Sequence, residues 1–446
     1  FPGRRCGIAL APAHLRMIVL PPRGRCCRCP GGSPRSRCFC LVCAIALTAA
    51  AAAVILQRSL PPPAPALVAQ PSSGTVAPRS ASLGSAAVLK PNISFPAFAA
   101  CKPEVIEYGQ SGFPRERPVL GVQVCNDQTA DPTRDTPEEL RSYERQLRQL
   151  SVLLKSIMLF SNGPVHVAVV VDTADTFNGV LELPSGWPAD FCSRLSISRH
   201  FLYYPRRGEF LKYMNRPCSS QRHFFPQQFP HTDFILNIDT DVILLASVED
   251  LWAHFQRLDP QQVIGMAAMA HDTARNHAEF EKFPKPRHPD GVGDGINTGI
   301  SLFALARWRR RFPKYTDMLV GWYKKYGKFF RFPTQDLFNV FLAEQPQVYY
   351  KLPCNWNIRP TLCHTRELGR HRVCTLLERE GARALHGAGG HLVRGDAFPW
   401  HQIFRAIESH DLGDGTPALR SALRASVRGV GKDKFRCASA LGKDFR

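Results

Sequence analysis

The chain has 446 residues and carries 57 lysines and arginines against 37 aspartates and glutamates, which gives a net charge of +20. This length accommodates one large domain, or two ordinary domains with extensions. Nine arginines and no acidic residue lie in residues 1–58, and no aromatic-rich basic repeat or zinc-finger spacing follows them. The charge therefore indicates a basic head and an ordinary basic surface, and it argues against a nucleic-acid-binding protein.

The N-terminal region predicts a membrane anchor. Residues 1–37 form a basic segment that we interpret as a cytoplasmic tail, and the uncharged run 38–56 has nearly the 20 residues that span a bilayer. Positive residues stay on the cytoplasmic side, so we expect a single-pass type II protein. A cleaved signal peptide is the alternative interpretation. Because the chain starts with Phe1 and Met17 follows, residues 1–16 are interpreted as a gene-model artefact.

Residues 57–115 are rich in Pro, Ala and Ser and predict an extended stem. The stem contains Asn92, which lies in an Asn-Ile-Ser sequon and is the expected N-glycosylation site. Eight of the 15 cysteines lie between Cys101 and Cys437, an even number that is compatible with a disulfide set in an oxidising compartment. No CxxC pairs have the spacing of a structural zinc site, so we do not expect one.

From residue 118 onward, apolar runs alternate with a helical pattern. We expect strands at 118–124, 164–172, 233–238, 262–268 and 298–305. A helix should begin at Thr136, which Pro137 and Glu139 follow in a capping-box pattern. The alternation predicts an α/β fold with a mixed, mostly parallel sheet that helices flank on both faces. We assign this domain to residues 116–425 and a basic C-terminal tail to residues 426–446.

The segment "FILNIDTDVILL" (234–245) places Asp239 and Asp241 inside an apolar run. Ionised carboxylates are rarely buried without a partner. In an open α/β sheet, ligands bind beyond the carboxyl ends of the strands, and residues one apart on an extended chain point the same way. The pair therefore predicts a site for Mg²⁺ or Mn²⁺ that holds a nucleotide diphosphate. An acidic pair that only caps a turn is the simpler alternative.

Three further segments carry candidate residues. "GDGINTGISLF" (293–303) is a glycine-rich turn that enters a strand, and it offers the amide of Asn297 to sugar hydroxyls. "TQDLFN" begins a helix with Gln335 and Asp336, although an acid there is also common at helix N-termini. "LHGAGG" places His386 in a glycine loop. A lone histidine is usually structural, but beside a metal site it becomes a third ligand.

The order of these segments resembles that of family 8 glycosyltransferases of the GT-A (Rossmann-like) fold, and most closely that of the glucoside xylosyltransferases. "CSSQRHFF" followed by "NIDTDVILLASVEDLW" is similar to the first block of that family. "GINTGISLF", "TQDLFN", "LPCNWNIRP" and "LHGAGG … FRAIES" are similar to its later blocks, in the same order. The resemblance covers roughly residues 117–410.

The resemblance implies a retaining enzyme that uses UDP-xylose and Mn²⁺ or Mg²⁺. It would add xylose in α1,3 linkage to O-linked glucose on EGF-like repeats of Notch-type glycoproteins, in the Golgi or endoplasmic reticulum. By this resemblance, the metal ligands are Asp239, Asp241 and His386. The donor contacts are Arg222, Asp239, Asn297 and Gly299. The residues that line the reaction centre are Gln335 and Asp336.

The chain departs from the family after His386, where the glycine loop is several residues longer and Arg394 is the nearest cation to replace the usual lysine. Trp356 either stacks on the acceptor glucose or is a buried structural residue. Three rival functions remain at this stage. They are a family 8 transferase with another UDP-sugar or acceptor, a non-catalytic membrane-tethered binding protein, and a two-metal phosphohydrolase, for which the further His and Asp ligands are missing.

Overall fold

The computed structural model describes residues 101–108, 112–113, 117–126, 142–213, 217–269, 280–288, 295–360, 374–387, 391–395 and 399–427. The chain divides into two units, 1–91 and 92–446, and the described residues all belong to the second. The expected anchor 38–56, the sequon at Asn92, the helix cap at Thr136 and the tail beyond residue 427 lie outside them. Within the described ranges, no helix has the length and apolar character that a membrane span requires.

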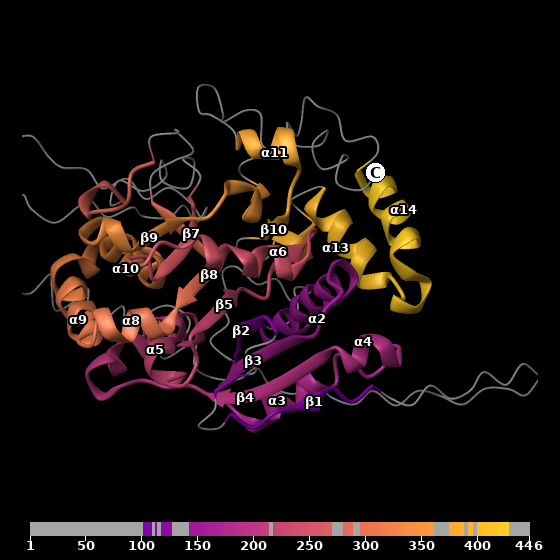
Figure 1. Ribbon diagram of the computed structural model, residues 1–446, viewed down its shortest axis with the longest axis horizontal. Helices are drawn as coiled ribbons and strands as arrows, with labels where there is room; N and C mark the ends of the chain where they lie inside the picture. Colours follow the sequence, from indigo (N-terminus) through magenta and orange to yellow (C-terminus); the bar gives the residue numbers. More distant parts are fainter. Residues whose placement is uncertain are drawn as a thin grey trace, which may run out of the picture. The chain divides into compact units, whose positions relative to one another are not determined.

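An eight-stranded sheet forms the centre of the second unit (Figure 1). Its order is β1-β4-β3-β2-β5-β8-β7-β9. Neighbouring strands are parallel except at β8, which runs antiparallel to both β5 and β7. The strands of this sheet are β1 (Glu104–Val105), β2 (Val119–Val124), β3 (Val165–Val171), β4 (Leu195–Phe201), β5 (Phe234–Ile238), β7 (Ile264–Ala268), β8 (Ile296–Ala304) and β9 (Tyr349–Lys351). The predicted mixed, mostly parallel sheet is confirmed.

The strands form because apolar runs are buried on both faces of the sheet. Every residue of β2 and β3 is buried. In β3, Val167 and Val169 pack into one hydrophobic core, whereas Ala168 and Val170 pack into another on the opposite face. This alternation is the period of two that an extended chain imposes. Burying one valine side chain contributes about 1.5–3 kcal/mol, so strands of this composition are held mainly by their helical covers.

Two groups of helices supply these covers (Figure 1). The longer helices of the first core are α2 (Ser142–Phe160), α13 (Trp400–Ser409) and α14 (Gly415–Val427). Those of the second core are α9 (Tyr315–Tyr326) and α10 (Pro333–Glu344), which the seven-residue α8 (Leu305–Arg311) joins. The other described α-helices are α3 (Ala174–Leu181), α4 (Ala189–Ser193), α5 (Phe225–Gln228), α6 (Val248–Trp252), α11 (Thr375–Glu380) and α12 (His391–Arg394).

Three disulfides join distant parts of the described chain. They pair Cys101 with Cys192, Cys125 with Cys218, and Cys354 with Cys374. The first bond and the parallel pairing of β1 with β4 attach residues 101–106 to the sheet. The folded domain therefore includes residues that the composition placed in the stem, because a two-residue strand leaves no periodic pattern in the sequence.

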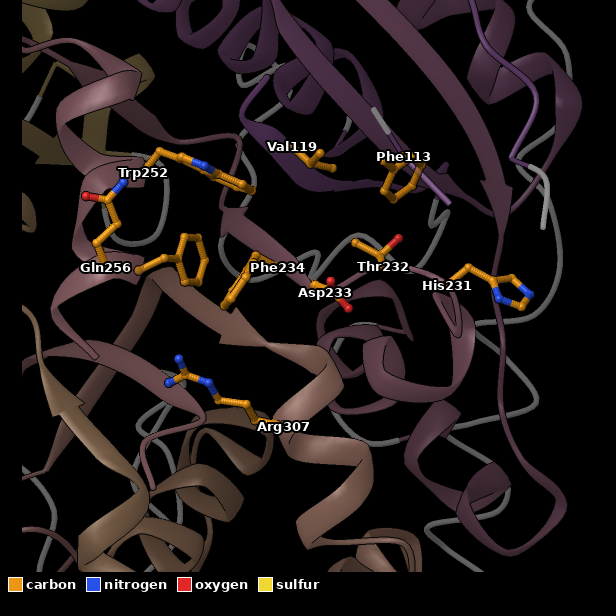
Figure 2. A pocket seen from close by; sticks show the side chains of 10 residues that line it. Phe113, Val119, His231, Thr232, Asp233, Phe234, Trp252, Gln256 and Arg307 are labelled. Atoms are coloured by element: carbon orange, nitrogen blue, oxygen red, sulfur yellow. The ribbon is translucent and has the colours of Figure 1, made fainter. Parts of the chain in front are cut away.

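A second, two-stranded sheet lies beyond the carboxyl end of β5. It pairs β6 (Val242–Leu244) antiparallel with β10 (Ala384–His386). A cavity of about 420 Å³ opens at the other end of β5, beside Asp233 and Phe234 (Figure 2). Trp252 and Arg307 also line this cavity, and none of the predicted site residues does. The candidate site therefore lies at the carboxyl end of the sheet, away from this cavity.

Candidate functional site

Asp239 and Asp241 lie in a turn between β5 and β6. The Val242 N–H donates to the carbonyl oxygen of Asp239 at 3.2 Å and closes the turn. The expected extended geometry for this pair is therefore wrong. A turn, and not the alternation of a strand, brings the two carboxylates to one side of the chain.

The pairing of β10 with β6 delivers His386 to the same turn. His386 is the register partner of Val242, and the Gly387 N–H donates to the carbonyl oxygen of Asp241 at 2.7 Å. The backbone ladder thus fixes the histidine beside the two acids, although more than a hundred residues separate them in the sequence.

The three side chains form a cluster that is suited to a divalent cation. One ligand atom from each of Asp239, Asp241 and His386 lies within 4.8 Å of the others. The Nε2 atom of His386 is 3.3 Å from Oδ1 of Asp241 and 4.0 Å from Oδ2 of Asp239. Two carboxylates and one imidazole match the ligand types that bind divalent metals in proteins. These residues fit the metal that the sequence predicts.

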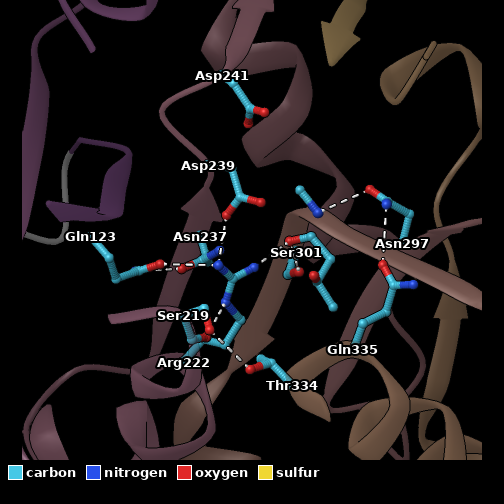
Figure 3. A network of polar contacts seen from close by, with 12 residues as sticks. Gln123, Ser219, Arg222, Asn237, Asp239, Asp241, Asn297, Ser301, Thr334 and Gln335 are labelled. Carbon is cyan, nitrogen blue, oxygen red and sulfur yellow. Dashed lines mark hydrogen bonds and ion pairs between the residues drawn. The ribbon is translucent and has the colours of Figure 1, made fainter. Parts of the chain in front are cut away.

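Arg222 forms a hydrogen-bonded ion pair with Asp239 (Figure 3). It lies in the 3-10 helix Pro217–Phe224, and its Nη2 donates to Oδ1 of Asp239 at 2.7 Å. Its other donors bind the backbone carbonyls of Ser219 and Thr298 and the side chain of Gln123. The guanidinium therefore positions a metal-site carboxylate, and the donor contact that the resemblance implies stays a prediction.

Burial raises the pKa of Asp239, and the nearby charge of Asp241 raises it further, whereas Arg222 opposes both effects. A cation between the carboxylates would have the same sign as Arg222. Binding of a divalent metal therefore favours the ionised form of Asp239.

Asn297 and Gly299 lie in β8, where its pairing with β7 shifts at a β-bulge. The carbonyl oxygen of Gly299 accepts from the Asp239 N–H at 2.8 Å, so the bulge is attached to the metal-site turn. A Cβ atom on Gly299 would overlap the imidazole of His386 and would lie 2.8 Å from its Nε2 atom. Glycine is therefore required here for close approach of the two segments.

We expect Gly299→Ala to weaken Mn²⁺ binding roughly tenfold or more, because the methyl group displaces the imidazole from the carboxylates. Titration followed by electron paramagnetic resonance of free Mn²⁺ measures the affinity. Gly321→Ala in α9 is the matched control, since a Cβ atom there meets nothing within 4 Å. Equal Mn²⁺ affinity in the two variants would contradict the packing argument.

Gln335 reaches the site and Asp336 does not. The Oε1 atom of Gln335 accepts from Nδ2 of Asn297 at 3.1 Å (Figure 3). The Oδ2 atom of Asp336 instead accepts from the backbone N–H groups of Arg331 and Phe332, at 2.9 and 2.8 Å. The expected role of Asp336 at the reaction centre is therefore corrected. Its carboxylate caps the start of α10, and burial raises its pKa to about 7.

The structure favours the second of the two interpretations of Trp356, that of a buried structural residue. Its ring is only 1% exposed and packs in the first hydrophobic core, with Arg383 over one face at 5.4 Å. A ring in this position does not stack on an acceptor sugar. Arg394 ends α12, and its side chain lies outside the described part of the chain, as do residues 388–390 of the glycine loop.

Three residues that sequence reasoning missed support the site. The Oδ1 atom of Asn357 lies 3.0 Å from Nδ1 of His386, where it can accept a hydrogen bond from the ring. Nε2 of Gln123 donates to Oδ1 of Asn237 at 2.6 Å beneath Arg222. Asn357 directly follows Trp356 in the motif "CNWNIRP", which was the available signal. Gln123 and Asn237 are polar residues inside apolar strands, which is a weaker signal of the same kind.

Comparison with known proteins finds similarity to glycosyltransferases. The sequence profile described as "Glycosyl transferase family 8" matches residues 216–378. Glucoside xylosyltransferase 1 of Rattus norvegicus is 29% identical over 71% of this chain and 68% of that protein. Glucoside xylosyltransferase 2 of Mus musculus is 30% identical over 60% of this chain and 61% of that protein. The chain thus spans about two thirds of the length of these relatives.

A crystal structure of mouse xyloside xylosyltransferase 1 in its apo form aligns with a TM-score of 0.43 and 18% identity. The alignment covers 64% of this chain and 99% of that one. The match to the family profile spans Arg222, the two acids, Asn297 and Gln335. By sequence, residues 216–378 match the family described as "Glycosyl transferase family 8", and the chain is a homologue of the glucoside xylosyltransferases.

Proposed function

We propose that the chain transfers xylose from UDP-xylose, in α1,3 linkage, to O-linked glucose on EGF-like repeats, with retention at the anomeric carbon. The observation that supports this proposal most directly is the cluster of Asp239, Asp241 and His386 at the carboxyl end of the sheet. It occurs in a chain whose relatives are named glucoside xylosyltransferases.

The residues of the cluster would hold Mn²⁺ or Mg²⁺. When bound there, the cation supplies positive charge to the diphosphate of the donor and to the charge that grows on the leaving group. Asp239 is held in place for this by Arg222 at 2.7 Å, and His386 by its pairing with β6. Asp241 completes the set from the same turn.

The proposed chemistry is a same-face substitution. The bond between the xylose anomeric carbon and the diphosphate oxygen breaks, and its electron pair stays on UDP. The oxygen of the glucose hydroxyl forms the new bond to that carbon, and its proton passes to the departing phosphate. Gln335 is a poor nucleophile, so we assign its amide dipole to stabilisation of the oxocarbenium-like carbon. Asn297 holds Gln335 by a hydrogen bond of 3.1 Å.

We also propose the cellular setting. The uncharged run 38–56 would anchor a type II protein, with the folded domain in the lumen of the Golgi or endoplasmic reticulum. The three disulfides support this proposal, because an oxidising compartment preserves them. The acceptors would then be secreted or cell-surface glycoproteins, and no nucleic acid is expected as a partner.

The test is a transfer assay with the purified chain, Mn²⁺, an O-glucosylated EGF-like repeat and a panel of UDP-sugars, with product mass as the readout. We expect the mass of one pentose to be added from UDP-xylose. Asp241→Asn should lower the rate about 100-fold or more, because losing a metal ligand removes several kcal/mol of transition-state charge stabilisation.

Asp317→Asn is the control, since Asp317 lies in an exposed ion pair on α9. Addition of a hexose would contradict UDP-xylose as the donor and would leave the proposed metal chemistry unchanged. Absence of transfer from every UDP-sugar, with Mn²⁺ bound, would contradict the proposed function and favour a non-catalytic binding protein.

A further inference from the structure

A row of hydrogen-bonded side chains joins the metal site to Gln335. His386 Nδ1 lies 3.0 Å from Oδ1 of Asn357, and Nδ2 of Asn357 donates to Oδ1 of Asn297 at 2.7 Å. Nδ2 of Asn297 then donates to Oε1 of Gln335 at 3.1 Å. All four side chains are buried, with 8% exposure or less. Each polar atom in the row therefore depends on its neighbour for a partner.

The backbone N–H of Gly299 determines, for each amide in the row, which atom is the oxygen and which is the nitrogen. The Gly299 N–H points at a side-chain atom of Asn297 at 3.1 Å. A backbone N–H can only donate, so this atom of Asn297 must be the oxygen. The same oxygen accepts from Asn357, so the nitrogen of Asn357 faces it and the oxygen of Asn357 faces His386. Reversing any amide in the row would place two hydrogen-bond donors or two acceptors against each other.

This direction determines which nitrogen of His386 carries its proton. An oxygen that faces Nδ1 requires a proton on Nδ1, so the lone pair of the neutral ring lies on Nε2. Nε2 is the atom that lies 3.3 Å from Oδ1 of Asp241 and 4.0 Å from Oδ2 of Asp239. The row therefore presents an imidazole lone pair to the same space as the carboxylates, the arrangement that a divalent cation needs.

The other end of the row orients Gln335. Because Asn297 donates to Oε1, the amide nitrogen of Gln335 is directed to Sδ of Met269, at 3.1 Å. The orientation of Gln335 and the tautomer of His386 thus follow from one backbone N–H. A change at either asparagine breaks the connection between them.

We propose that Asn357 and Asn297 are positioning residues, and that their amides, directed by the Gly299 N–H, hold His386 as the Nδ1–H tautomer with Nε2 presented to a divalent cation. The consequence for metal binding rests on the proposed function, in which His386 is a ligand. The tautomer itself does not depend on the reaction, so it can be measured independently.

The first test is nuclear magnetic resonance of the metal-free full chain, labelled with ¹⁵N-histidine, at about pH 8, where an ordinary histidine is neutral. Correlation spectra distinguish Nδ1–H from Nε2–H rings, and comparison with a His386→Gln sample assigns the signal. We expect Nδ1–H in the parent protein and a loss of this preference in Asn357→Leu. An Nε2–H ring in the parent protein, or an unchanged ring in Asn357→Leu, would overturn the proposal.

The second test is Mn²⁺ affinity without donor or acceptor. We expect Asn357→Leu to weaken binding roughly 10–100-fold, the usual cost of losing a residue that orients a metal ligand. Asn355→Leu is the matched control. Asn355 is equally buried in the same segment, but its amide donates to the carbonyl oxygen of Gly381 and does not contact His386. Equal losses in both variants would mean a general structural effect and would overturn the role of Asn357.

The two tests separate this inference from the proposed function. A protein with the Nδ1–H ring and the expected loss in Asn357→Leu, but without transfer activity, supports the positioning role and contradicts the enzyme. A protein that transfers xylose with an Nε2–H ring contradicts the positioning role alone.

Discussion

Replacing Arg222 with methionine is expected to lower the free energy of unfolding by about 3–5 kcal/mol, the usual cost of removing one partner from a buried ion pair. The Arg222 side chain is 6% exposed, and it pairs with Asp239 at 2.7 Å. It also satisfies the carbonyl oxygens of Ser219 and Thr298. Methionine fills much of the volume but leaves these acceptors without the donor and Asp239 without its cation.

An exposed ion pair of the same length provides the matched control. Arg207 pairs with Asp317 at 2.7 Å, but its side chain is 76% exposed. Water and salt screen such a pair, so Arg207→Met should leave stability unchanged within error. Urea denaturation of the metal-free protein measures both variants. Arg222→Lys should not restore stability, because one ammonium group cannot replace the planar guanidinium across all these acceptors. Equal stability of Arg222→Met and Arg207→Met would contradict the buried role.

Much of the sheet could be predicted because its strands are long and apolar. The runs that became β2, β3 and β5 carry few polar residues, and their order along the chain predicts the parallel arrangement. β4 was missed because its sequence "LSISRHF" mixes polar and apolar residues. Ser196 and Ser198 are buried through hydrogen bonds to His166 on β3, a relation between strands that no local pattern contains. His200 in turn is hydrogen-bonded to Ser198.

The metal site was predicted as a set of residues but not as a geometry. The ordered motifs assign Asp239, Asp241 and His386 together, and the structure places them within 4.8 Å. A turn and the three-residue strands β6 and β10 bring these side chains together. These strands are too short to leave a periodic pattern in the sequence. The roles of Trp356 and Asp336 depend on which way each side chain points. Motif position alone does not determine that direction.

The pH dependence of stability is expected to be the second large effect. Four of the buried histidines, His166, His200, His223 and His254, form hydrogen bonds as neutral rings. Burial lowers the pKa of His166 and His223 to about 3, and that of His200 and His254 to about 4. An unfolded chain binds protons at histidine with a pKa near 6.5. Below that pH the unfolded chain binds more protons, so stability is complete above about pH 6.5 and is lost as the pH falls toward the folded-state values.

Asp336 has the opposite effect on the pH dependence of stability. Its folded pKa of about 7 lies above its ordinary value, so the folded chain holds one more proton there between about pH 7 and pH 4. Four protons gained by the histidines and one retained by Asp336 leave a net uptake of roughly three on unfolding. The free energy of unfolding should therefore fall by about 3 kcal/mol between pH 7 and pH 5.5, a large part of the 5–15 kcal/mol typical of domains.

Two variants are expected to change the slope of stability against pH in opposite directions. In urea denaturation across this pH range, His166→Gln should flatten the slope by one proton, because the neutral amide does not titrate. Asp336→Asn should steepen the slope by one proton, because it removes the group that offsets the histidines, while its amide oxygen still caps Arg331 and Phe332. Changes of the same sign in the two variants would contradict the assignment. Parallel slopes would place the acid sensitivity in other groups. The opposite signs matter because a general loss of packing shifts stability equally at every pH and leaves both slopes unchanged.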